Sequence, residues 1–214
     1  MTKQVVSTSL SVALATGIYG VSFGAIGVAA GLDVLSVMLL SLLMFSGASQ
    51  FAFVGVVAAG GAPITAIASA WLMGVRNSFY ALRMNPEFEP KGFLRLLRAQ
   101  LTIDESNAVS AAQQGYKDRD LGFWLTGIGV FVFWNLATLL GAIGGNLIGS
   151  VDVWGLDAAA AAAFLGLLWP RLKENLLLAA LGALVALVSV PFLPAGVPIL
   201  LAALVALLPI GRRK

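Results

Sequence analysis

The sequence predicts an all-α integral membrane protein with about seven transmembrane helices. Of its 214 residues, 59% are hydrophobic and only 11% are charged, whereas a soluble domain carries about 25% charged residues. The mean hydropathy is +0.94. The apolar residues also form long runs, of about the length that crosses a bilayer core, roughly 20 residues. These observations together indicate a chain that crosses the membrane several times.

Seven hydrophobic segments can be delimited, and several of them end at a proline. The first is too long for the apolar core of a signal peptide and lacks a cleavage site, so we interpret it as a span. The fifth is short and is predicted as a tilted or partial span. The segments are 9–31, 34–59, 63–84, 121–148, 156–170, 174–192 and 195–210.

The basic residues predict the orientation of these spans. With seven crossings, three basic regions fall on one side: 83–120, the turn after the fifth segment, and the C-terminal tail. Positive charge marks the cytoplasmic side of bacterial membrane proteins. We therefore expect a plasma-membrane protein with the N-terminus outside and the C-terminus in the cytoplasm, Lys3 being the one charge that disagrees.

A short motif occurs twice and suggests an internal repeat. Gly-Ala-Ile-Gly at 24–27 is followed by Gly-Leu-Asp at 31–33, and the same order recurs at 141–144 and 155–157. If three crossings separate the copies, the second is inverted, as in many secondary transporters. Chance recurrence in a chain rich in Gly and Ala is the alternative. The predicted organisation is one membrane domain with these parts: a first repeat at 9–84, a cytoplasmic loop with an amphipathic segment at 85–120, a second repeat at 121–192, and a last span with a basic tail at 193–214.

The second hydrophobic segment is interrupted at its centre by Ser46-Gly47-Ala48-Ser49-Gln50. Small and polar residues weaken a helix, and the freed backbone groups then need partners in place of water. In transporters such breaks present helix termini and free carbonyls to the substrate. Close packing of two helices through small residues is the alternative.

Arg76 is the sharpest anomaly, because it lies inside the third segment. A charged side chain there costs about 2.5 kcal/mol or more and is usually paired or functional. Tyr80 and Arg83 share its helix face at spacings of four and seven. We expect Arg76 to face a cavity and neutralise a carboxylate, the alternative being that it extends to the headgroups.

Three further polar positions are weaker candidates. Asn135 belongs to a stripe of small and polar residues on one face of the fourth segment, which suits either a cavity lining or helix packing. Asp104 and Glu105 are adjacent, so on a helix they diverge by about 100° and cannot act as a paired dyad. They suit a solvated helix, but they are also candidates for proton coupling.

The chain contains no Cys and no His. This removes thiol and imidazole catalysis and most transition-metal ligands. We therefore expect no enzyme activity, no metal site and no cofactor.

Five blocks in this order and spacing, covering about 20–172, resemble the AzlC family, the large subunits of bacterial branched-chain amino acid exporters. The blocks are FSGASQF, GVRNSFYAL, QLTIDES, WNLATLLGAIGG and GLDAAAAAAFLGLL. One departure concerns the second block, where the commonest family form has Asn and His in place of Gly74 and Asn77. It leaves the role of Arg76 intact and affects the identity of the substrate.

The resemblance implies an exporter of valine, leucine, isoleucine and, in some members, methionine that works with a small AzlD-type membrane subunit and an ion gradient. For a zwitterionic substrate we expect Arg76 and the backbone N–H groups after the break to bind the carboxylate. Gln50 and Asn135 would receive the ammonium group, and apolar walls would come from Phe45, Phe51, Tyr80 and Trp134. The predicted substrate site comprises Ser46, Gly47, Ser49, Gln50, Arg76, Tyr80 and Asn135. Asp104 and Glu105 are the candidates for proton coupling, and Asp104 is the first to test because it matches the family block.

Two other functions stay open on the sequence. The first is transport of another small zwitterion or organic anion, or transport in the opposite direction. The second is a membrane assembly subunit without transport activity, in which the polar blocks only pack against a partner.

Overall fold

The fold is known from a computed structural model that describes residues 2–148, 165, 169, 172 and 175–207. Within these residues every regular element is helical, which confirms the predicted all-α class. The predicted fifth segment, the second Gly-Leu-Asp and the basic tail lie essentially outside the described residues. The helices are α1 (Thr2–Gly17), α2 (Tyr19–Ala29), α3 (Val34–Leu43), α4 (Gly47–Ala58), α5 (Pro63–Phe88), α6 (Gly92–Gln100), α7 (Asp104–Ala111), α8 (Tyr116–Ile148), α10 (Leu176–Ser189), α11 (Val197–Leu204) and the short 3-10 helix η2 (Val205–Leu207).

Two of these stretches are long and apolar enough to cross a bilayer by length and composition. They are Lys3–Ala29, formed by α1 and α2 with a turn at Ile18, and Tyr116–Gly145 within α8. α5 has 26 residues, about 39 Å at 1.5 Å per residue, but it carries Arg76 and Arg83. The predicted count of seven spans is not confirmed.

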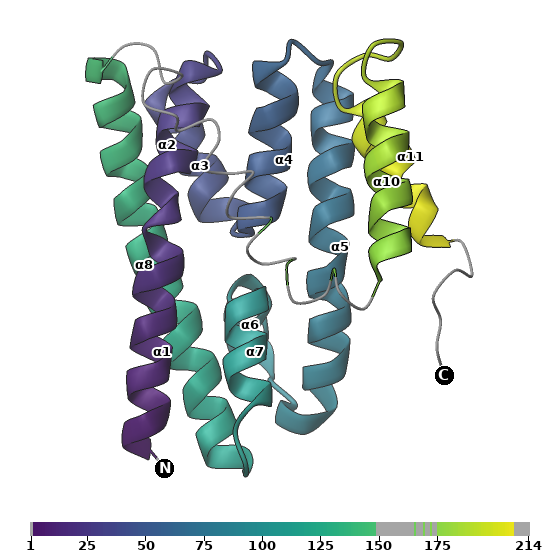
Figure 1. The fold of residues 1–214 in the computed structure, drawn as a ribbon. Coiled ribbons are helices and arrows are strands. Elements are labelled where there is room, and N and C mark those ends of the chain that lie inside the picture. Colours follow the sequence, from purple (N-terminus) through teal and green to yellow (C-terminus); the bar gives the residue numbers. More distant parts are fainter. Residues whose placement is uncertain (1, 149–164, 166–168, 170–171, 173–174, 208–214) are drawn as a thin grey trace.

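The predicted second span, 34–59, is a helical hairpin. α3 leaves the end of the molecule at which α2 stops, and α4 returns to that same end (Figure 1). With 10 and 12 residues, the two helices measure about 15 and 18 Å, too short to cross a core of about 30 Å. The interruption in the sequence is therefore the tip of a re-entrant hairpin.

A second hairpin, α6–α7, enters from the opposite end (Figure 1). Its tip at 101–103 meets the tip of the first hairpin at 44–46, and the Gln100 side chain donates a hydrogen bond of 2.8 Å to the Leu42 carbonyl. The region predicted as a cytoplasmic loop thus folds into the interior. Arg98 holds it there: its guanidinium lies 4.0 Å from the Phe88 ring centroid and pairs with Asp120 at the start of α8.

α2 and α8 cross very closely because glycines face each other's backbone. A Cβ on Gly20 would lie 2.5 Å from the Trp134 carbonyl oxygen, and one on Gly24 would lie 2.6 Å from the Ala142 nitrogen. Small residues permit such close approach of helices inside membranes. The contact brings the two Gly-Ala-Ile-Gly motifs together.

The inverted repeat is not confirmed. α1–α2 and α8 run in the same direction, since Val5 lies beside Gly122, Ala13 beside Gly129, and α2 beside the second half of α8 (Figure 1). The prediction counted 34–59 as a crossing. Because that segment turns back, the two motifs are not inverted with respect to each other.

Candidate functional site

The tip of the first hairpin presents the N-terminus of α4 to the interior. Ser46, the residue before α4, is extended (φ −158°, ψ 101°), and its side chain does not cap the helix. The first N–H groups of a helix have no intrahelical acceptor and carry a partial positive charge. The break therefore lies at 44–46, slightly before the predicted 46–50, and Gly47 to Ser49 form the first turn of α4.

Gln50 stabilises this hairpin. Its side chain is fully buried, and its amide nitrogen donates to the carbonyls of Leu40 at 3.1 Å and Ser41 at 3.4 Å. These carbonyls belong to the last turn of α3, where intrahelical donors run out. The Leu40 carbonyl also accepts the Met44 N–H at 3.0 Å, so the Ser41 carbonyl is the one that depends on Gln50. Gln50 does not line the cavity described below.

Arg76 on α5 faces the interior and pairs with a carboxylate, in the manner expected from the sequence. Its Nη2 lies 2.6 Å from Oδ2 of Asp104, the first residue of α7. Tyr80, one turn further along α5, donates a hydrogen bond of 2.7 Å to the other oxygen of Asp104. α5 and the second hairpin are therefore connected through one carboxylate.

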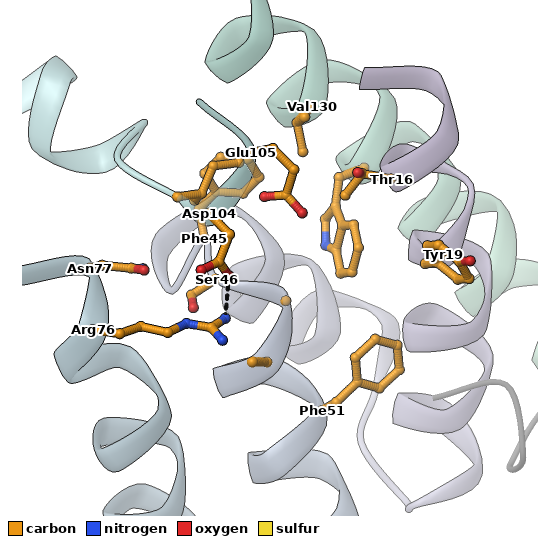
Figure 2. Close-up of a pocket in the computed structure, with 14 residues that line it drawn as sticks. Thr16, Tyr19, Phe45, Ser46, Phe51, Arg76, Asn77, Asp104, Glu105 and Val130 are labelled. Carbon is orange, nitrogen blue, oxygen red and sulfur yellow. Dashed lines mark ion pairs between the residues drawn. The ribbon is translucent and has the colours of Figure 1, made fainter. Parts of the chain in front are cut away.

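A cavity of about 200 Å³ lies between the two hairpin tips, α5 and the α1–α2 and α8 pair (Figure 2). Aromatic rings form much of its wall, and Phe51 packs edge-on against Trp134 at 6.2 Å between centroids. Its volume suits a small solute rather than a drug-sized molecule. The lining residues are Thr16, Tyr19, Phe45, Ser46, Gly47, Ala48, Phe51, Arg76, Asn77, Ile103, Asp104, Glu105, Val130 and Trp134.

Glu105 directs its carboxyl group into this cavity, near Thr16 (Figure 2). Burial raises the pKa of the Glu105 carboxyl above its ordinary value, and the charge of Asp104 raises it further. The backbone N–H of Glu105, the charge of Arg76 and a hydrogen bond with Thr16 act in the opposite direction. The cavity therefore contains a carboxyl group that is harder to ionise than a solvated one.

Several hydrogen-bonding atoms of the lining are buried without a partner among the described residues. Arg76 Nε and Trp134 Nε1 are such donors, and Asn77 Oδ1 is such an acceptor. Buried polar groups are normally paired with protein or ordered water. A polar molecule between these walls would supply the missing partners.

The structure brings together only part of the predicted site. Ser46, Gly47 and Arg76 line the cavity, as do Asp104 and Glu105 and the predicted walls Phe45, Phe51 and Trp134. The other predicted residues hydrogen-bond within the protein: the Ser49 hydroxyl donates to Ser46, Tyr80 donates to Asp104 on α7, and the Asn135 amide donates to the Phe131 carbonyl, one turn back in α8.

Thr16, Tyr19, Asn77, Ile103 and Val130 line the cavity but were not predicted. The sequence contained a signal that could have indicated Thr16 and Tyr19. Thr16-Gly17 interrupts an apolar run just before the turn at Ile18, as Ser46-Gly47 interrupts the next one. Ile103 and Val130 are ordinary apolar residues whose position depends on tertiary packing.

This site belongs to a helical protein with two stretches long and apolar enough to cross a membrane, and its solute-sized cavity lies between the two hairpin tips, α5 and the α1–α2 and α8 pair. The AzlC protein family matches residues 11–148, and the chain belongs to that family. The resemblance drawn from the five blocks is therefore confirmed.

The chain is also similar to two curated proteins, one from each of two strains of Helicobacter pylori. Both are described as an uncharacterized membrane protein, and each is 24% identical over 176 residues, covering 81% of this chain and 76% of the relative. No solved structure gives a significant match. Family and relatives together support a transporter-type role in a membrane.

Proposed function

We propose that the protein is a secondary-type transporter that exports branched-chain and related hydrophobic amino acids across the bacterial plasma membrane. It is not an enzyme in this proposal, and it acts as the large subunit beside a small AzlD-type membrane partner. The observation that carries the proposal is the cavity itself. Arg76 and the uncapped N-terminus of α4 share with Glu105 a cavity lined by aromatic rings.

A branched-chain amino acid has three parts, and each finds a complementary surface in the cavity. The carboxylate suits the N–H groups at Gly47 and Ala48 and the guanidinium of Arg76, because helix N-termini and arginine both favour anions. The ammonium group suits the Glu105 carboxylate and the unpartnered Asn77 Oδ1. The aliphatic side chain suits the rings of Phe51 and Trp134.

The charge distribution of the fold supports a cytoplasmic N-terminus, whereas the sequence predicted an N-terminus outside. Because 34–59 turns back, Lys3 lies at the same end as the loop that follows α5 and the start of α8 (Figure 1). Lys91, Lys117 and Arg119 share that end, whereas the described turns at the other end carry no Lys or Arg. By the positive-inside rule the N-terminus is cytoplasmic in this proposal, and Lys3 no longer disagrees.

The experiment that tests the function is efflux from bacteria preloaded with isoleucine, valine, leucine or methionine. It compares the chain alone, the chain with a small AzlD-type subunit, and the same pair carrying Arg76→Ala. Arg83→Ala is the matched control, because Arg83 lies on the same helix outside the cavity. We expect efflux that needs both subunits, disappears with Arg76→Ala and persists with Arg83→Ala.

Two results would contradict the proposal. Absence of efflux for all four amino acids from a correctly assembled pair would favour another small zwitterion or an organic anion, with 4-methylpentanoate as the first one to test. Unchanged flux per assembled complex with Arg76→Ala would remove Arg76 from the substrate site. If the variant changed only the yield of complex, the polar blocks would serve assembly.

A further inference from the structure

The two acids of the cavity have different surroundings although they are adjacent in sequence. Asp104 is engaged by two neighbours on α5, the guanidinium of Arg76 at 2.6 Å and the hydroxyl of Tyr80 at 2.7 Å. Glu105 forms no ion pair among the described residues, and its carboxyl lies in the cavity near Thr16 (Figure 2). Asp104 is therefore held in place, whereas Glu105 is available to a solute.

Among the described groups that face Glu105, the cation is Arg76, and its charge is shared with Asp104. α5 contributes Arg76, which is already bound to Asp104, and α7 contributes the like charge of Asp104 itself. α2 contributes the phenol of Tyr19, and α8 contributes only the uncharged Val130 and Trp134. An ionised Glu105 in the empty cavity thus lacks full compensation, which agrees with the raised pKa of its carboxyl.

We propose that Glu105 exchanges its proton for the ammonium group of the transported amino acid. This inference rests on the proposed function, since it requires a substrate with an ammonium group in this cavity. In the empty cavity Glu105 carries a proton. When the zwitterion binds, its ammonium group takes the place of that proton and forms an ion pair with the carboxylate.

The exchange conserves charge and atoms. The O–H bond of the Glu105 carboxyl breaks, and the proton passes to water at the side to which the cavity is open. The substrate enters as a neutral zwitterion, and its ammonium group and Glu105 form a neutral pair. The cavity therefore carries either a proton or an amino acid at this carboxyl, but not both.

Such competition gives transport a direction. Where water is more acidic, Glu105 is protonated and the amino acid is released. Where water is less acidic, the proton leaves and the amino acid binds. A bacterium maintains the more acidic side outside, so proton entry drives amino acid exit, and Glu105 alone couples the two fluxes.

The test measures proton release on binding. Purified protein, in the form that the export assay shows to be active, is titrated with L-leucine by calorimetry in buffers of different ionisation enthalpy, at several pH values from 4.5 to 8. The wild type should release up to one proton per bound leucine at the acidic end, and release should fall towards zero at high pH. Glu105→Gln should release none, whereas Glu89→Gln, an exposed acid outside the cavity, should behave as the wild type.

Two analogues separate this inference from the proposed function. 4-Methylpentanoate lacks the ammonium group and should bind without proton release, whereas isoamylamine retains that group and should release a proton if it binds. Leucine binding without proton release at every pH would overturn the exchange and leave the proposed function standing. Equal release from Glu105→Gln would assign the proton to another group. Absence of leucine binding would overturn the proposed function, and the exchange with it.

Discussion

Arg76 on α5 and Asp104 on α7 form an ion pair of 2.6 Å at the edge of the cavity, and it joins a long helix to the tip of the second hairpin. About one third of each side chain remains accessible, 38% for Arg76 and 31% for Asp104. A pair of this exposure stabilises a fold only modestly, by about 1 kcal/mol or less. Its accessibility suits a group that contacts a solute better than one that only stabilises the fold.

Removal of both charges should separate these two roles. Arg76→Gln combined with Asp104→Asn preserves side-chain size and leaves no unpaired charge, so the thermal midpoint should stay within a few degrees of the wild type. Amino acid export should nevertheless be lost, because the carboxylate loses its cation. Thermal unfolding in detergent and efflux from preloaded cells measure the two effects. Normal export by this double variant would contradict the role of Arg76.

The raised pKa of Glu105 predicts a pH dependence of stability. A carboxyl whose pKa is higher in the folded than in the unfolded protein binds its proton more tightly when folded, so stability falls as the pH rises from the unfolded value, near 4.5, through the folded one. Glu105→Gln cannot titrate and should lack this component. Thermal midpoints of the ligand-free protein between pH 4.5 and 8, followed by tryptophan fluorescence, should fall more steeply for the wild type. Identical slopes would show that Glu105 ionises normally.

Gly24 on α2 tests the close crossing of α2 and α8, and Gly55 on α4 is the matched control. Gly24→Ala places a methyl group 2.6 Å from the Ala142 nitrogen, so the helices must separate, at a cost of about 1–3 kcal/mol or more. Gly55→Ala in α4 meets nothing within 4 Å and should be neutral or stabilising by up to about 1 kcal/mol. Yield of monodisperse protein and thermal midpoint measure both. Equal behaviour of the two variants would exclude the glycine contact as a determinant of the fold.

Gln50→Leu should destabilise the hairpin without acting on the substrate directly. The change leaves the Ser41 carbonyl without a donor among the described residues, at a cost of about 1–3 kcal/mol, whereas the Leu40 carbonyl keeps the Met44 N–H at 3.0 Å. We expect a lower thermal midpoint and, for the folded fraction, a leucine Kd within threefold of the wild type. A tenfold weaker Kd at unchanged stability would return Gln50 to the substrate site, where the sequence had placed it.

Cysteine accessibility tests the orientation of the first crossing, which the hairpin at 34–59 reverses by the positive-inside rule. Because the chain has no cysteine, Lys3→Cys and Ala29→Cys each carry one thiol. The fold puts them at opposite ends of α1–α2, and with a cytoplasmic N-terminus a membrane-impermeant maleimide should label only Ala29→Cys in intact spheroplasts. Lys3→Cys should react after permeabilisation. The reverse pattern would support the orientation with seven crossings.

The sequence alone determined the membrane class, the helical composition and the family, because hydrophobic runs and the five blocks are local features. It also located the interruption near Ser46 and the cavity-facing Arg76, since polar groups at membrane depth require a partner wherever the chain leads. The elements of the candidate site that depend on local chemistry were thus largely predictable. The role of Gln50 was not predictable in this way, because its hydrogen-bond partners lie on the other helix of the hairpin.

Tertiary structure decided what those features do. An apolar segment of 26 residues has the same composition whether it crosses the membrane or turns back halfway. Only the fold therefore distinguished a span at 34–59 from a hairpin. That one difference changed the relation of the two Gly-Ala-Ile-Gly motifs and the end at which Lys3 lies. Likewise, Asp104 and Glu105 are neighbours that look equivalent in sequence. Both line the cavity, but packing places Arg76 and Tyr80 against the Asp104 carboxylate and leaves the Glu105 carboxyl without an ion pair among the described residues, because adjacent side chains on a helix point about 100° apart.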